Sequence, residues 1–122
     1  MIDRKVVQCV ILRLPPPISA NAIWRSVRGR NIKSARYREW EIDAGIKLCV
    51  QNPGRIDGPY ALTIKVPKKC RLDLDNVPKA ISDLCQKHGI ISNDRLCAKL
   101  LVERGVEDET VCMLVSTKGE QE

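Results

Sequence analysis

The fold class is indicated most directly by residues 60–94, YALTIKVPKKCRLDLDNVPKAISDLCQKHGIISND. Apolar and polar side chains alternate over Tyr60–Val66, which predicts a β-strand with one buried face. A helix is expected to begin at Asp75, with the Asp75 side chain as its N-cap. Pro78 then falls in the first turn, where an N–H has no intrahelical partner. Gly89 suits the left-handed residue that ends a helix. The stretch therefore predicts a strand–helix unit of an α/β (α+β) domain.

Further elements are expected on both sides of this unit. Upstream, an apolar strand over Lys5–Leu14 is followed by three prolines and by an exposed basic loop over Ile18–Lys33, with a short strand near its end. Ser34 is expected to cap a helix over Ala35–Val50. Downstream, two more strands are expected, over Leu96–Arg104 and Thr110–Ser116. We expect a single domain over residues 1–122, with a mixed sheet of about four to five strands, two main helices and a frayed tail over 117–122.

The core is expected to be aliphatic, because aromatic residues make up 3% of the chain and phenylalanine is absent. Along the helix over residues 35–50, one apolar stripe recurs at spacings of three and four residues. Its members are Tyr37, Trp40, Ala44 and Leu48. The scarcity of aromatic residues also argues against a protein that binds single strands by stacking bases on aromatic side chains.

Six cysteines stand at positions 9, 49, 70, 85, 97 and 112, without a C-x-x-C pair or a histidine cluster, so the spacing of a zinc site is absent. Five of them, Cys70 being the exception, fall in apolar strand-like or helix-like runs, where a free cysteine behaves as a small hydrophobic residue. The N-terminus does not resemble a secretory signal, and no apolar run approaches the roughly 18 residues of a membrane span. We therefore expect a cytoplasmic protein with reduced thiols and no membrane partner.

The charge of the chain is positive and unevenly distributed. The formal net charge is +6 and the pI is about 9.1. From Met1 to Trp40, nine basic residues stand against two acidic ones, which gives +7, whereas acidic residues gather between Glu103 and Glu109. A basic surface attracts polyanions, which makes nucleic acid a candidate partner; the alternative is that the charge serves solubility alone.

Two carboxylates, Asp73 and Asp75, are separated by one residue, and in an extended segment such side chains point to the same side. A divalent cation between them would relieve their repulsion, and Mg²⁺ prefers hard oxygen ligands. The alternative is that Asp75 only caps the helix and Asp73 is only solvated. Lys79 lies one turn beyond Asp75 and would contact a phosphate, or pair with Asp83 on the surface. Asp94 joins this group only if the chain returns to the start of the helix after the helix has ended.

The run Leu72–Ala80, followed by Asp83-Leu84, Gly89-Ile90 and Asn93-Asp94, closely resembles the RusA family of Holliday junction resolvases. The N-terminal part is similar as well, and its matching residues are Leu14-Pro15-Pro16, Asn21, Trp24-Arg25 and the segment from Ser34 to Tyr37. The resemblance spans most of the chain, from about Leu14 to Val106.

Two positions depart from the family pattern. Leu72 directly precedes the first aspartate, where family members usually carry an arginine, and here Arg71 stands one position earlier. Asn93 precedes Asp94, where family members usually have a second acidic residue. The site would thus carry one negative charge fewer, so a lower metal affinity and a different cleavage preference are expected.

The resemblance implies a homodimeric, Mg²⁺-dependent endonuclease of bacterial or phage origin that resolves four-way DNA junctions by paired cuts in DNA recombination and repair. Mn²⁺ would substitute for Mg²⁺, and no small-molecule cofactor is implied. Asp73, Asp75 and Asp94 would bind the metal, with Lys79 as a further catalytic residue. The basic residues expected to hold phosphates rather than to read bases are Arg25, Arg28, Arg30, Lys33, Lys69 and Arg71.

Two other functions stay open at the level of the sequence. The first is a non-catalytic module that binds DNA junctions and uses its aspartates only to shape the fold. The second is a metal-dependent nuclease that acts on another branched DNA or on RNA, because phosphate chemistry is shared and substrate choice depends on dimer geometry. His88, the only histidine, is expected at a helix end for packing or dipole compensation rather than for catalysis.

Overall fold

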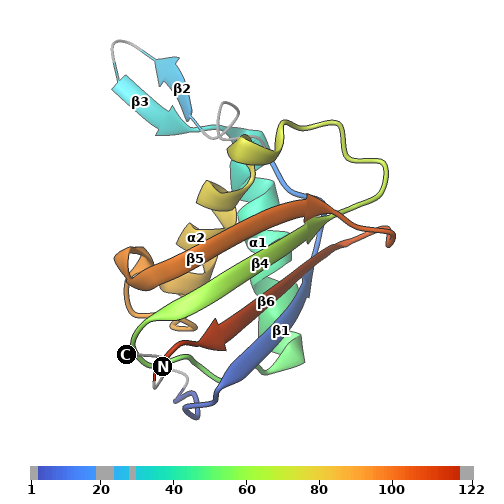
Figure 1. The fold of residues 1–122 in the computed structure, drawn as a ribbon. Helices are drawn as coiled ribbons and strands as arrows, with labels where there is room; N and C mark the ends of the chain where they lie inside the picture. Colours follow the sequence, from blue (N-terminus) through green and yellow to red (C-terminus); the bar gives the residue numbers. More distant parts are fainter. Residues whose placement is uncertain (1–2, 19–23, 28–29, 119–122) are drawn as a thin grey trace.

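The centre of the molecule is a four-stranded mixed sheet in the order β1-β6-β4-β5. The structure is a computed structural model, which describes residues 3–18, 24–27 and 30–118. The sheet consists of β1 (Cys9–Leu14), β6 (Thr110–Ser116), β4 (Tyr60–Val66) and β5 (Cys97–Arg104). Neighbouring strands are antiparallel except β4 and β5, which run parallel (Figure 1). This arrangement confirms the predicted α+β class with a mixed sheet.

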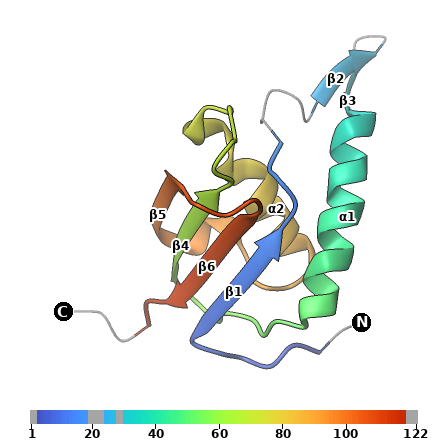
Figure 2. The same ribbon diagram turned by 90° about the vertical axis from the view of Figure 1, so that its right-hand side faces the viewer.

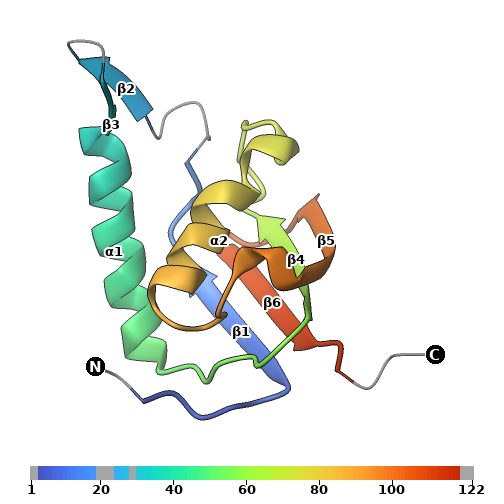
Figure 3. The same cartoon turned by 90° about the vertical axis from the view of Figure 1, so that its left-hand side faces the viewer.

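Two helices, α1 (Ala35–Gln51) and α2 (Pro78–Lys87), cover one face of the sheet. Figures 2 and 3 show both helices on the same side, with the opposite face of the sheet uncovered. The strands follow this arrangement, because in β1 and β6 every second residue is buried, as expected when only one face is covered. The two predicted main helices are therefore confirmed, and they fill the layer above the sheet.

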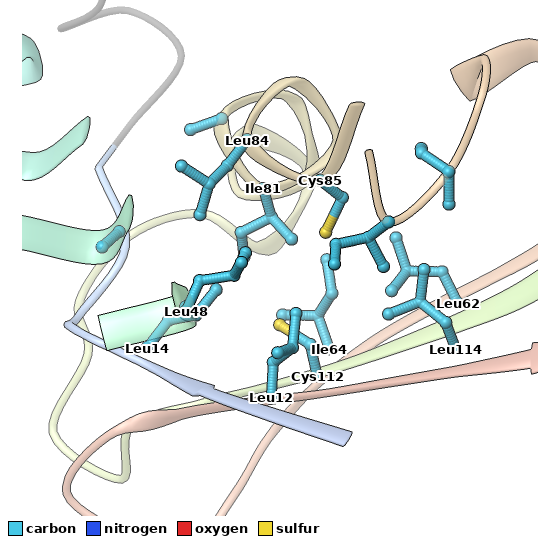
Figure 4. Packing of buried hydrophobic residues seen from close by; sticks show 14 of the residues in the cluster. Leu12, Leu14, Leu48, Leu62, Ile64, Ile81, Leu84, Cys85, Cys112 and Leu114 are labelled. Carbon is cyan, nitrogen blue, oxygen red and sulfur yellow. The ribbon is translucent and has the colours of Figure 1, made fainter. Parts of the chain in front are cut away.

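The core lies between this sheet face and the two helices. Leu12, Ile64 and Leu114 rise from three strands toward Ile81 and Leu84 of α2 (Figure 4). The stripe predicted on α1 is confirmed, since Tyr37, Trp40, Ala44 and Leu48 are all buried. Ser34 is the N-cap of α1, and its hydroxyl oxygen accepts from the Tyr37 N–H at 3.1 Å. Periodicity and capping therefore located α1 correctly from the sequence.

The segment ahead of β1 differs from the prediction. The expected strand over residues 5–14 begins only at Cys9, while Val6 forms an isolated parallel bridge with Arg55. Arg4 is buried, and its guanidinium donates to the carbonyls of His88 at 2.8 Å and Pro53 at 2.9 Å. Arg4 therefore ties the N-terminal segment to the ends of both helices, and its charge is not part of an exposed basic surface.

The predicted basic loop over residues 18–33 contains a hairpin. Strands β2 (Trp24–Val27) and β3 (Arg30–Lys33) pair antiparallel, and this two-stranded sheet projects from the body just ahead of α1 (Figure 1). The short strand expected near residues 30–33 is confirmed, and β2 was not predicted. Residues 19–23 and 28–29 lie outside the described part of the chain.

All six cysteines are free thiols, as predicted, but they are not all buried. Cys85 and Cys112 lie in the core, where burial raises the pKa of both thiols. The prediction was wrong for Cys9 and Cys49, which are exposed because each lies on the side of its element that faces away from the core. Among the described residues, no helix has the length and apolar character needed to span a bilayer.

Candidate active site and nucleic-acid interface

Asp73 and Asp75 lie at a short 3-10 turn, η2 (Leu74–Asn76), between β4 and α2. The predicted role of Asp75 as the N-cap of the helix is wrong. Because the 3-10 turn uses residues 74–76, α2 begins only at Pro78, and its N-cap is Val77, whose side chain has no acceptor. Pro78 occupies the first turn of the helix, as predicted.

Both carboxylates are exposed, and the part of the fold that the structure describes does not use them. Asp73 is the N-cap of η2, yet its side chain makes no capping hydrogen bond. Within the described ranges, neither the Asp73 nor the Asp75 carboxylate takes part in a hydrogen bond or ion pair. Two uncommitted carboxylates, two residues apart in the chain, provide the hard oxygen donors that suit a divalent cation such as Mg²⁺.

Lys79 lies in the first turn of α2, close in sequence to this pair. Its ammonium lies 3.3 Å from the Oδ1 atom of Asp83, one turn along the helix, and the Lys79 side chain is 57% exposed. Ion pairs of this kind contribute only about 0.3–0.5 kcal/mol. The lysine can therefore leave Asp83 for a phosphate at small cost.

Asp94 lies at the opposite end of α2. It begins the 3-10 turn η3 (Asp94–Leu96), and its N–H donates to the side-chain oxygen of Gln86, in the last turn of α2, at 3.0 Å. Figure 1 shows η2 and η3, yellow and orange, at opposite ends of the helix. In the described part of the chain, no group of three or more His, Cys, Asp or Glu side chains is close enough to hold a metal ion.

The topology accounts for this separation. Strands β4 and β5 are parallel, so Tyr60 pairs with Cys97 at one end and Val66 with Arg104 at the other. Asp94 precedes the start of β5, whereas Asp73 follows the end of β4. Ile90 is buried and hydrogen-bonded to Cys85 and Ile56, which keeps the chain at the C-terminal end of α2. Within one chain, the structure brings Asp73, Asp75 and Lys79 into one region and leaves Asp94 apart.

Five of the six basic residues named from the sequence are described by the structure, and they lie in elements at the η2 end of the molecule. Lys69 and Arg71 are exposed in the connector between β4 and η2. Arg25 lies in β2, and Arg30 and Lys33 lie in β3. The hairpin and the connector lie at the same end of the molecule in all three views (Figures 1–3). Arg28 lies outside the described residues.

A second group of basic residues forms ion pairs with the acidic turn before β6. Arg13 pairs with Glu107 and with Glu109, and Lys47 also pairs with Glu109. Lys47 and then Arg13 lower the pKa of the Glu109 carboxyl, and the two glutamates raise the pKa of Arg13. The acidic turn before β6 thus offsets part of the N-terminal positive charge. Sequence spacing gave no sign of these contacts, because they join positions more than 60 residues apart.

One residue beside the site was missed altogether. Arg104, the last residue of β5, donates to the carbonyl oxygens of Cys70 at 2.6 Å and Leu72 at 3.2 Å, in the connector that leads to Asp73. The sequence carried no signal for this contact, since Arg104 stands at the end of a strand among other charged residues.

Comparisons with known proteins identify the family of the chain. The family model described as "Endodeoxyribonuclease RusA" matches residues 14–114, a range that includes Asp73, Asp75, Lys79 and Asp94. The chain belongs to the RusA family. This RusA-family chain is 30% identical over 108 residues to the crossover junction endodeoxyribonuclease RusA of Aquifex aeolicus (strain VF5). The match covers 86% of this chain and 85% of that protein. The chain is 31% identical over 114 residues to the protein of the same name from Escherichia coli O139:H28 (strain E24377A / ETEC). That match covers 88% of this chain and 85% of the relative.

Family membership confirms the resemblance found in the residue pattern. Each relative is named for endonuclease activity at crossover junctions, and the match runs through both the hairpin and the strand–helix unit. The RusA-family chain thus carries two uncommitted carboxylates, a lysine and a set of basic residues at one end of its fold.

Proposed function

We propose that this chain is a structure-specific DNA endonuclease that resolves Holliday junctions by hydrolysing phosphodiester bonds. The observation that carries the proposal is the pair Asp73 and Asp75, exposed and unused by the fold, within a chain whose family is described as endodeoxyribonucleases. A structural role would require these carboxylates to make a cap or an ion pair, and within the described residues they make neither.

We propose Asp73 and Asp75 as the principal ligands of a Mg²⁺ ion, which Mn²⁺ would replace. Their exposure and their oxygen donors fit a cation that keeps several waters and binds one or two carboxylates together with phosphate. The ion would lower the pKa of a bound water and offset the charge of the phosphate. Within one chain Asp94 lies apart from this pair, at the other end of α2. It is proposed as a third ligand on the strength of the family motif alone, and its contribution is tested separately from that of the pair.

The other residues of this end would bind and orient DNA. Lys79, released from Asp83, would place a positive charge against the phosphate that is cut. The residues proposed to hold neighbouring phosphates and fix the position of the junction are Arg25, Arg28, Arg30, Lys33, Lys69 and Arg71. We also propose a homodimer, because two matched cuts in a symmetric four-way junction require two copies of one site.

The deciding experiment is the cleavage of a labelled synthetic four-way junction in Mg²⁺, Mn²⁺ and EDTA, with linear duplex of the same sequence as control and a DNA flap and an RNA strand as alternative substrates. Paired nicks in opposing strands, present with either metal and absent in EDTA, are expected. Binding without cleavage in any metal would favour a non-catalytic junction-binding module. Equal cleavage of flaps or RNA would favour a nuclease with another substrate.

A further inference from the structure

The connector between β4 and η2 has few backbone contacts of its own. Over Pro67–Leu72 it forms no helix or strand, and its N-terminal part is held by two hydrogen bonds, from the Lys68 N–H to Glu107 at 2.9 Å and from the Cys70 N–H to Pro67 at 2.9 Å. Beyond Cys70, the contact that fixes the connector ahead of Asp73 comes from the side chain of Arg104.

The Arg104 guanidinium engages two carbonyls that are two residues apart. Its Nη1 atom lies 2.6 Å from the Cys70 oxygen and its Nη2 atom 3.2 Å from the Leu72 oxygen. Because the guanidinium is planar and rigid, two such bonds set the direction of the chain between the carbonyls, which a single point charge does not do. Leu72 directly precedes Asp73 in the chain, so the position of the Leu72 carbonyl also constrains the backbone of Asp73.

The side chains on either side of the carboxylates complete the arrangement. Leu72 and Leu74 are half-buried and pack against the core, while Asp73 and Asp75 are exposed. The two leucines therefore face the core and the two aspartates face the solvent. The leucines fix which side of the segment faces the solvent, and Arg104 fixes where the segment lies against the end of the sheet.

We propose that Arg104 is a positioning residue, which holds the connector through the Cys70 and Leu72 carbonyls so that Asp73 and Asp75 are presented together to a divalent cation. This inference rests on the proposed function only in assigning metal binding to Asp73 and Asp75. The two hydrogen bonds of Arg104 do not depend on that function.

The first test uses hydrogen exchange, which requires neither metal nor DNA. In Arg104→Ala, the Cys70 and Asn76 amides, which donate to Pro67 and Asp73 on either side of the Arg104 contact, should exchange at least about tenfold faster than in the wild type. Peptides from α1 and β6 should stay unchanged. Arg104→Lys, which keeps the charge but can reach only one carbonyl at a time, should fall between the two. Lys118→Ala is the matched control, because Lys118 is an exposed cation that pairs with Asp57 away from the connector.

The second test measures metal binding directly, by Mn²⁺ paramagnetic resonance titration in the absence of DNA. Arg104→Ala should weaken the Mn²⁺ affinity several-fold, with Arg104→Lys intermediate and Lys118→Ala unchanged. Junction affinity, measured in EDTA, should decrease no more in Arg104→Ala than in Lys118→Ala, because both variants lose one positive charge. It should be unchanged in Arg104→Lys, which keeps the charge.

Two outcomes would overturn the inference. Unchanged exchange over residues 70–76 would show that the guanidinium does not hold the connector. Unchanged Mn²⁺ affinity with a selective loss of junction affinity and a shallower salt dependence would make Arg104 a phosphate contact instead. A wild type that cuts no junction would refute the proposed function, while the exchange result would still decide whether Arg104 holds the connector.

Discussion

Lys79 and Asp83 form an ion pair across one turn of α2, with 3.3 Å between the ammonium and the Oδ1 atom and both side chains more than one-third exposed. For Lys79, the sequence left two roles open, contact with a phosphate and a surface ion pair with Asp83. The structure shows the ion pair. It does not decide between the two roles, because an exposed i,i+4 pair is weak enough to exchange for a phosphate. The two roles differ in what happens when each partner is removed.

Replacing Lys79 by Met should lower junction cleavage at least about tenfold, because the charge that faces the phosphate is lost. The free energy of unfolding should change by no more than about 0.5 kcal/mol. Asp83→Asn is the matched control, since it breaks the same ion pair and keeps the lysine. It should retain cleavage close to that of the wild type, measured as single-turnover rates. Equal losses of cleavage in the two variants would show that cleavage depends on the ion pair and not on the lysine charge alone.

Asp75→Asn should reduce cleavage by about 100-fold or more, because substitutions even in the surroundings of metal ligands cost about 10–100-fold. Binding of the junction in EDTA should be unchanged or slightly tighter, since a negative charge beside the DNA is removed. The urea midpoint should hardly move, because Asp75 caps no helix. Asp94→Asn is measured in parallel, and a normal cleavage rate in that variant would exclude Asp94 from the metal site.

The hairpin gives a prediction about salt. Arg28→Ala combined with Arg30→Ala should weaken junction binding and reduce the slope of log affinity against log salt by about 1.8, which corresponds to two phosphate contacts. The matched control is Lys87→Ala combined with Lys118→Ala, which removes two exposed cations that pair with Glu41 and Asp57. A slope that falls equally in both double variants would reflect net charge alone and remove the hairpin from the interface.

Local patterns were sufficient to predict most of the elements. The 3.6-residue stripe and Ser34 placed α1, alternation placed β4 at Tyr60–Val66, and Gly89 has the expected left-handed φ of 76°. These features depend on neighbours a few residues apart, which the sequence displays directly. The start of α2 was misplaced because Asp75 has a good capping side chain, but a 3-10 turn separates it from the helix.

The arrangement of the candidate site depends on contacts between residues that are far apart in the sequence. Asp73, Asp75 and Lys79 could be proposed from the sequence because they are close in the chain, and the family match covers them. The place of Asp94 depends on β5 running parallel to β4, which no local pattern shows. Arg104 donates to carbonyls 32 and 34 residues away. Because every residue has a backbone carbonyl, the residue types at these positions do not reveal the contact. Contacts of this kind appear only in the folded chain.

The last prediction concerns His88, whose ring packs where the end of α2 meets α1. A Cβ atom on Gly45 would lie 2.9 Å from the His88 Nε2 atom, which shows how closely the two helices approach. Burial lowers the pKa of His88 from its usual 6.5, and the positive charges of Lys87 and Arg4 lower it further. Glu41 acts in the opposite direction, and the Cys49 sulfur lies 3.9 Å from the Nδ1 atom.

Because the pKa of His88 is lower in the folded state, the unfolded chain binds the extra proton more readily, and acid destabilises the fold. The contribution is complete above about pH 6.5, the unfolded value, and is lost as the pH falls through the lowered folded value. The wild type should therefore have a lower urea midpoint at pH 5.5 than at pH 7.5. His88→Gln should show a smaller difference, since its side chain does not titrate, and the lowered pKa of Glu109 keeps that carboxyl out of this window. An equal difference in both proteins would assign the pH dependence to other groups and leave His88 with a packing role alone.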